Sequence, residues 1–138
     1  MRLSDFAGDW DLTRRIDDAL TGQQGRFTGT ATFKEQADGM DYRETGTLRL
    51  GGSPPMTAVR RYVWADSGDA IAVFFDDGAP FHSFAKDGDG VGTPHLCGAD
   101  LYRVRYDFRD WPVWQARWDV KGPRKSYCLI SRYAPLTR

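Results

Sequence analysis

Hydrophobic and polar residues alternate along most of this chain with a period of two, which is typical of β-strands that bury one face. The clearest case is Phe27, Gly29, Ala31 and Phe33, which are separated by three threonines and followed by a lysine. Comparable segments predict about nine strands, at residues 10–17, 27–34, 40–48, 58–64, 71–75, 95–97, 102–108, 114–120 and 127–133. No amphipathic helix pattern of similar length is present.

Short clusters rich in glycine, aspartate, serine and proline separate these segments, and most have hairpin length. Sequential strands can therefore pair with one another and curl until the sheet closes. We predict an all-β, antiparallel meander barrel of about eight to ten strands, with a sandwich as the alternative. A short helical turn is expected around Leu3–Ala7, with Ser4 as its N-cap.

The length and composition support one domain over residues 1–138. Five Trp, six Tyr and eight Phe accompany fifteen Gly, as expected of strands that bend around an interior filled by rings. Lys and Arg together number 19, the same as Asp and Glu, so the balance predicts neither nucleic acid nor a membrane as partner.

The N-terminal residues contain no apolar run of signal-peptide length, and no stretch approaches the roughly 20 apolar residues of a membrane-spanning helix. We therefore expect a cytoplasmic protein. In that compartment Cys97 and Cys128 are expected to be reduced thiols rather than a disulfide.

The segment Gly8-Asp9-Trp10 opens the first predicted strand and resembles the Gly-x-Trp signature of lipocalins and their calycin relatives. In those proteins the tryptophan closes one end of the barrel beneath an arginine or lysine of the last strand. The resemblance implies that Arg132 or Arg138 supplies this cation here.

A wider set of motifs spans nearly the whole chain: Gly8-x-Trp10, Tyr42-x-Glu44-x-Gly46, Arg60-x-Tyr62-x-Trp64, Phe75-x-Asp77-Gly78-x-x-Phe81-His82, His95-x-Cys97-x-x-Asp100-x-Tyr102 and Gly122-Pro123-x-Lys125-x-Tyr127. Together they resemble an uncharacterised bacterial lipocalin-like family, the domain-of-unknown-function family 6314. The resemblance implies a calycin-like barrel and no particular activity.

Charged residues occupy faces that the alternation predicts to be inward, namely Arg14, Glu44 and Arg60. Tyrosines lie on similar faces at positions 42, 62, 102, 106 and 127. An isolated buried charge costs several kcal/mol, so these groups must pair with one another, reach water or meet a ligand. The open alternatives are a network that sets strand register and a pocket in which Arg14 and Arg60 face a carboxylate or phosphate.

The two histidines, His82 and His95, add candidate chemistry. With Cys97 and Asp100 they include the ligand types of a metal site, but they lack a recognised ligand spacing. Either histidine could be an axial haem ligand, and Cys97 with a histidine could act as a nucleophile, although no motif selects these roles. No metal or cofactor is predicted.

We therefore predict a barrel that binds a small, potentially anionic organic molecule in a polar and aromatic cavity. The alternatives are an enzyme that uses Glu44, a histidine or a tyrosine for acid–base chemistry, a haem- or metal-binding barrel, and a solid barrel that dimerises. Whether the chain is an enzyme is left open. The predicted ligand-binding residues are Arg14, Glu44, Arg60, Tyr62, His82, His95, Cys97, Asp100, Tyr102, Lys125 and Tyr127.

Overall fold

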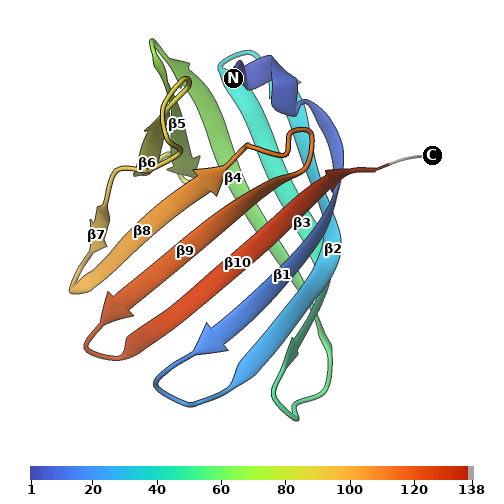
Figure 1. Cartoon of the computed structure of the whole chain (residues 1–138), viewed down its shortest axis with the longest axis vertical. Coiled ribbons are helices and arrows are strands. Elements are labelled where there is room, and N and C mark those ends of the chain that lie inside the picture. The colour runs from blue at the N-terminus through green and yellow to red at the C-terminus, as the bar shows by residue number, and fades with distance from the viewer. Residues whose placement is uncertain (137–138) are drawn as a thin grey trace.

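Ten antiparallel strands form a single curled sheet in the part of the chain that the structure, a computed structural model, describes, residues 1–136 (Figure 1). A single 3-10 turn, η1 (Leu3–Phe6), precedes them. The strands are β1 (Gly8–Asp18), β2 (Gln24–Gln36), β3 (Gly39–Leu50), β4 (Met56–Ser67), β5 (Ala70–Phe75), β6 (Pro80–Ala85), β7 (His95–Cys97), β8 (Asp100–Asp107), β9 (Trp114–Gly122) and β10 (Lys125–Pro135).

The strand order is β6-β5-β4-β3-β2-β1-β10-β9-β8-β7, so each strand pairs with its sequence neighbour except where β1 meets β10 and where β6 and β7 end the sheet. The loop before β7 bridges these two ends. Gly92 N–H donates to Val104 O on β8, and Thr93 N–H donates to Ser83 O on β6, both at 2.8 Å. The predicted meander barrel is confirmed, with a loop completing part of its wall.

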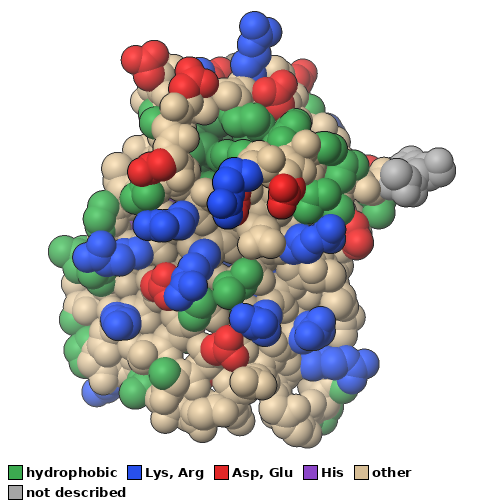
Figure 2. Space-filling view, in the orientation of Figure 1, with side chains coloured by type: hydrophobic (Ala, Val, Ile, Leu, Met, Phe, Trp, Pro, Cys, Tyr) green, Lys and Arg blue, Asp and Glu red, His purple; other side chains and the backbone are tan. Residues whose placement is uncertain are grey.

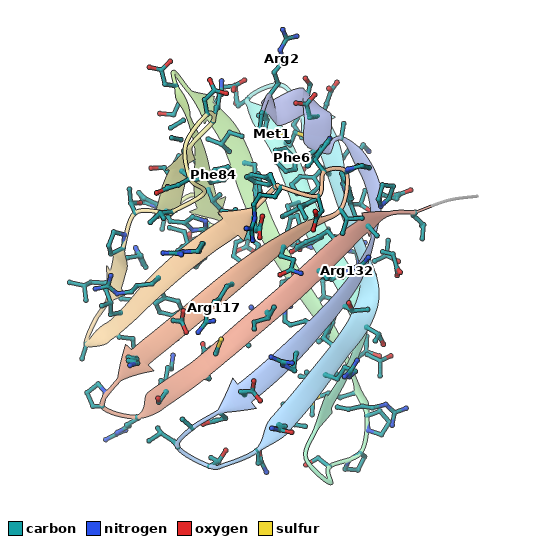
Figure 3. The ribbon with its side chains drawn as sticks, viewed as in Figure 1. Met1, Arg2, Phe6, Phe84, Arg117 and Arg132 are labelled. Carbon is teal, nitrogen blue, oxygen red and sulfur yellow. The ribbon has the colours of Figure 1, made fainter. Side chains whose placement is uncertain are left out.

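Aromatic side chains fill the end of the barrel that η1 covers. Phe6 is fully buried, and its ring lies 5.2 to 5.7 Å from those of Phe33, Trp64, Phe108, Trp111 and Trp114. Figure 3 shows Phe6 and Phe84 at this end. The core is therefore concentrated in one half of the barrel.

The helical turn forms as predicted, but Ser4 does not cap it. Arg2 is the N-cap residue, and its backbone N–H donates to Asp5 Oδ2 at 2.8 Å. The carboxylate of Asp5 thus replaces the expected serine hydroxyl, because it reaches back to the residue that precedes the turn.

The cation that was expected above Trp10 is not Arg132. Tyr133 points into the barrel, so its neighbour Arg132 points outward by strand alternation and is exposed (Figure 3). Instead, Trp10 Nε1 donates to Phe6 O at 2.8 Å, and its ring contacts Trp111. The other candidate, Arg138, lies outside the described residues. Cys97 and Cys128 are both free thiols.

The β5–β6 hairpin is short and leaves part of β4 without a neighbour. Pairing of β4 with β5 begins at Tyr62, whereas pairing with β3 begins at Met56. Figure 1 shows the hairpin beside the upper part of β4 only. The barrel wall is therefore complete at the η1 end and open at the other. No helix within residues 1–136 has the length and apolar composition needed to cross a membrane.

Candidate functional site

A cavity of about 240 Å³ opens at the end of the barrel opposite η1. Inward-facing positions near the ends of β1, β2, β3, β4 and β10 and the loop before β2 line it: Arg14, Ile16, Asp18, Gln23, Phe27, Glu44, Leu48, Leu50, Ala58, Arg60, Tyr127 and Leu129. The cavity therefore combines apolar walls with a few charged groups, as small-molecule sites usually do.

Arg14 and Glu44 form a buried ion pair at the inner side of this cavity. Arg14 Nη1 lies 2.6 Å from Glu44 Oε2, and Nη2 lies 2.9 Å from Oε1. Arg14 Nε also donates to Ser131 Oγ at 2.7 Å. The two charged side chains are only 6% and 2% exposed, so this forked geometry is what makes their burial tolerable.

The ion pair keeps both groups charged. Burial alone would raise the pKa of Glu44, but the hydrogen bonds and charge of Arg14 outweigh it and hold the pKa below its ordinary value. Burial likewise opposes the charge of Arg14, and the hydrogen bond and charge of Glu44 outweigh it, so the pKa of Arg14 is raised. At neutral pH this pair is therefore a fixed dipole rather than a proton donor.

Two tyrosines extend the network into the core. Tyr42 Oη donates to Glu44 Oε1 at 2.7 Å and lies 2.8 Å from Tyr133 Oη. Burial raises the pKa of Tyr133 to about 12, with the charge of Glu44 adding to the effect. Both phenols are buried and Glu44 accepts three hydrogen bonds, so the inward Arg, Glu and Tyr side chains at positions 14, 44 and 42 do form a network with one another.

Arg60 has a different environment from Arg14. It is the register partner of Glu44, yet the carboxylate turns to Arg14 instead. Arg60 is exposed, and its guanidinium lies 5.7 Å from the centre of the Trp118 ring. Among residues 1–136, no carboxylate oxygen lies within 4 Å of it. Arg60 is thus a cavity cation without a close ion pair among the described side chains, although its charge helps to lower the pKa of Glu44 and it interacts with Tyr62.

Tyr127 also lines the cavity, and burial raises its pKa to about 12, with Tyr102 contributing. Three further predicted residues gather nearby. Lys125 Nζ lies 3.3 Å from Asp100 Oδ2 and 3.5 Å from Tyr102 Oη. They occupy the β8–β10 rim without lining the cavity itself.

Tyr62 and His95 belong to an aromatic cluster between the cavity and the core. Both rings contact Phe81, with centroid distances of 6.1 Å and 5.4 Å, respectively. Tyr62 also contacts Trp118. These two residues therefore support the side of the barrel near Arg60 rather than form part of the cavity lining.

His82 and Cys97 lie apart from the cavity. His82 is buried with its Nε2 2.8 Å from Tyr106 Oη, while its Nδ1 has no hydrogen-bond partner among the described residues. Cys97 is exposed on β7. Within residues 1–136, no three His, Cys, Asp or Glu side chains are grouped closely enough to hold a metal ion.

Arg14, Glu44 and Arg60 of the cavity lining were expected from the sequence, whereas most of the apolar lining was not. Ile16, Leu48, Ala58 and Leu129 share inward faces with Arg14, Glu44, Arg60 and Tyr127 along their strands, as the alternation indicates. Their position near the strand ends opposite the helical turn was the available signal. Asp18 and Gln23, at the first hairpin, gave no comparable signal.

Comparison with known proteins places this barrel in a family. The model of a family of unknown function, DUF6314, matches residues 6–135. The chain belongs to this family. A search of curated proteins finds no match.

Among solved structures, the chain is similar to an S-type phycobiliprotein lyase, CPES, from Guillardia theta. The match has a TM-score of 0.68 and 10% sequence identity, and covers 99% of this chain and 91% of the lyase. At this identity the likeness concerns the fold, which is the calycin-like barrel that the motifs implied.

Proposed function

We propose that this DUF6314 member binds a small amphipathic organic anion in the cavity, with the anionic group at Arg60. The observation that carries the proposal is an exposed arginine that lines a mostly apolar cavity and has no described carboxylate oxygen within 4 Å. A carboxylate suits the forked donors of arginine, and Ile16, Leu48 and Leu129 would contact the apolar portion of the ligand.

The size of the cavity limits the ligand. Its volume of about 240 Å³ lies below the roughly 300 to 1,000 Å³ of sites for drug-sized molecules, which is also the range expected from the sequence. This volume supports a ligand such as a short-chain carboxylate and argues against haem. His82 lies outside the cavity lining, which also argues against haem ligation there.

Acid–base catalysis by Glu44 has less support than binding. A general base near neutral pH needs a pKa close to that pH, but Arg14 holds the pKa of Glu44 below its ordinary value. Both carboxylate oxygens already accept hydrogen bonds from Arg14 or Tyr42.

We place the binding function in the cytoplasm, where two free cysteines such as Cys97 and Cys128 are common.

Calorimetric titration with hexanoate and with hexanol tests this proposal, since the two probes share a tail and differ in charge. Hexanoate is expected to bind more tightly, and Arg60→Gln should weaken its binding about tenfold because one charge-assisted interaction is lost. Arg61→Gln is the matched control, because Arg61 is also exposed but lies on the opposite face of β4.

The hexanoate affinities of Arg60→Gln, Arg61→Gln and the unaltered protein decide whether Arg60 binds the anion. Equal binding of hexanoate by Arg60→Gln and the unaltered protein would refute the role of Arg60. Absence of binding by both hexanoate and hexanol would refute a small-ligand site in this cavity.

A further inference from the structure

The unpaired half of β4 is an edge strand beside the cavity. Residues Met56–Arg61 pair with β3 on one side, and the pairing of β4 with β5 starts only at Tyr62, opposite Phe75. Six residues of extended strand span about 20 Å. An edge of this length presents a row of unpaired backbone groups, which is a template for adding another strand.

The backbone groups that point to the open side can be identified from the neighbouring hairpin. Phe75 N–H donates to Ala79 O, so the backbone groups of Phe75 point away from β4. The Tyr62–Phe75 pair is therefore not hydrogen-bonded, and Tyr62 bonds to β3. Because the bonded direction alternates along a strand, the N–H and C=O groups of residues 57, 59 and 61 face the open side.

Exposed apolar side chains lie on both free edges of the open wall. Met56 and Val59 on β4 are 47% and 48% exposed, and Leu96 on β7, the terminal strand of the other sheet edge, is 68% exposed. Large apolar groups at a free strand edge favour contact with another chain.

Two arginines decide what kind of chain this edge fits. Arg60 and Arg61 are exposed, and the segment Met56–Arg61 contains no acidic residue. Arg61 also lies directly opposite Arg43 on β3, a like-charge pair that destabilises a sheet unless an anion approaches it. If this edge paired with the same edge of a second copy, the arginines of both copies would lie close together. Their like charges would disfavour that pairing.

We propose that residues 56–61 of β4 bind an extended acidic and apolar peptide segment of a partner protein by strand addition. The peptide backbone bonds to residues 57, 59 and 61. Its acidic side chains lie on the outer face of the sheet near Arg61, and its apolar side chains lie on the inner face near Met56. This interaction is separate from the binding of a small anion in the cavity.

Amide hydrogen exchange measured by NMR tests the proposal with a blocked seven-residue peptide that alternates glutamate and leucine. At saturation, exchange of the amides of Thr57, Val59 and Arg61 is expected to slow at least tenfold, because each amide gains a hydrogen bond. A counterpart with N-methylated backbone amides at alternate positions should give no protection, and one with lysine in place of glutamate should bind at least tenfold more weakly.

Three results would overturn strand addition: no protection by the glutamate peptide, equal binding of the lysine peptide, or protection that persists with the N-methylated peptide. Protection that rises with protein concentration alone would instead indicate self-association and would also overturn it.

Variants separate this interaction from the cavity. Val59→Pro removes one edge donor without removing a bond to β3, so it should abolish peptide protection while hexanoate still binds. Arg61→Gln should weaken the glutamate peptide about tenfold, whereas Arg49→Gln on β3 serves as the exposed control. Loss of peptide binding in Arg49→Gln to the same extent would contradict a specific edge. If the peptide does not bind while hexanoate still binds, strand addition is rejected and the proposed cavity function is unaffected.

Discussion

The charged side chains on the inner surface of this barrel have distinct roles that depend on single contacts. Arg14 and Glu44 bind each other in a forked pair, and Tyr42 completes the coordination of the carboxylate. Arg60, on the same inner surface, has no carboxylate within 4 Å among the described residues. The Arg14–Glu44 pair therefore contributes mainly to the structure, and Arg60 is the side chain available for contact with a ligand.

Replacing Glu44 with glutamine tests the structural role of the ion pair. We expect Glu44→Gln to lower the free energy of unfolding by about 3 to 5 kcal/mol, because it leaves the charge of Arg14 buried without a counter-charge. Urea denaturation measures this change. Asp107→Asn, which breaks an exposed pair with Arg109, should leave the midpoint nearly unchanged. Similar small shifts in both variants would contradict an essential buried pair.

His82 makes stability depend on pH in the mildly acidic range. Burial, with a contribution from the charge of His95, lowers the pKa of His82 from 6.5 to about 3. The unfolded chain therefore binds a proton that the folded chain does not between these two values, and stability falls as the pH drops below about 6.5. Above that pH both states are neutral and this contribution is constant.

Denaturation midpoints measured between pH 7 and pH 5 should reveal this contribution. The loss attributable to His82 is about 2 kcal/mol at pH 5, where most carboxylates are still ionised. His82→Phe should flatten the pH dependence in this window, although it also removes the partner of Tyr106. His95→Gln should keep most of this pH dependence, because burial is a larger cause of the lowered pKa of His82 than the charge of His95. A slope that survives in His82→Phe would show that another group is responsible.

At the scale of elements, two facing glycines allow β2 and β3 to approach closely. Gly29 lies opposite Gly46 in the register. A Cβ atom on Gly29 would overlap Thr45 O, and one on Gly46 would overlap Thr28 O. The two glycines thus allow a closer approach of β2 and β3 than residues with a Cβ atom would permit.

Gly46→Ala should destabilise the barrel by about 1 to 3 kcal/mol, because the added methyl group has to displace the backbone of β2. Thermal or urea unfolding measures the change. Gly52→Ala is a matched control, since a Cβ there meets no heavy atom within 4 Å. If Gly46→Ala and Gly52→Ala have the same stability, the close approach of β2 and β3 does not require glycine.

At the scale of the whole molecule, the barrel divides into a filled end and an open end. Phe6 and the rings around it occupy the filled end, while the cavity opens where β5 and β6 no longer cover β4. Figure 2 shows acidic side chains gathered toward the η1 end and cations spread over the outer face of β8, β9, β10 and β1. Arg117 and Arg132 contribute to that outer face (Figure 3). A neutral total charge thus conceals an uneven distribution.

Local alternation was enough to predict most of the strands and the face on which most residues lie, although β6 (Pro80–Ala85) was not predicted. Arg14 and Glu44 were expected inside and are buried there, and Gly8-x-Trp10 was expected to open the first strand and does so. This worked because the direction of a side chain depends on the parity of its position within its own strand. The cation above Trp10 was the failure, because Arg132 has the opposite parity from the inward Tyr133.

Which inward groups meet one another depends on contacts between distant segments, and periodicity contains no information about these. Glu44 faces Arg60 in the register but binds Arg14, thirty positions away. The length of the β5–β6 hairpin leaves Arg60 exposed and leaves Met56–Arg61 without a strand partner on one side. Alternation along one strand sets a face, whereas stagger, closure and the position of the cavity result from how all the strands pair around the barrel.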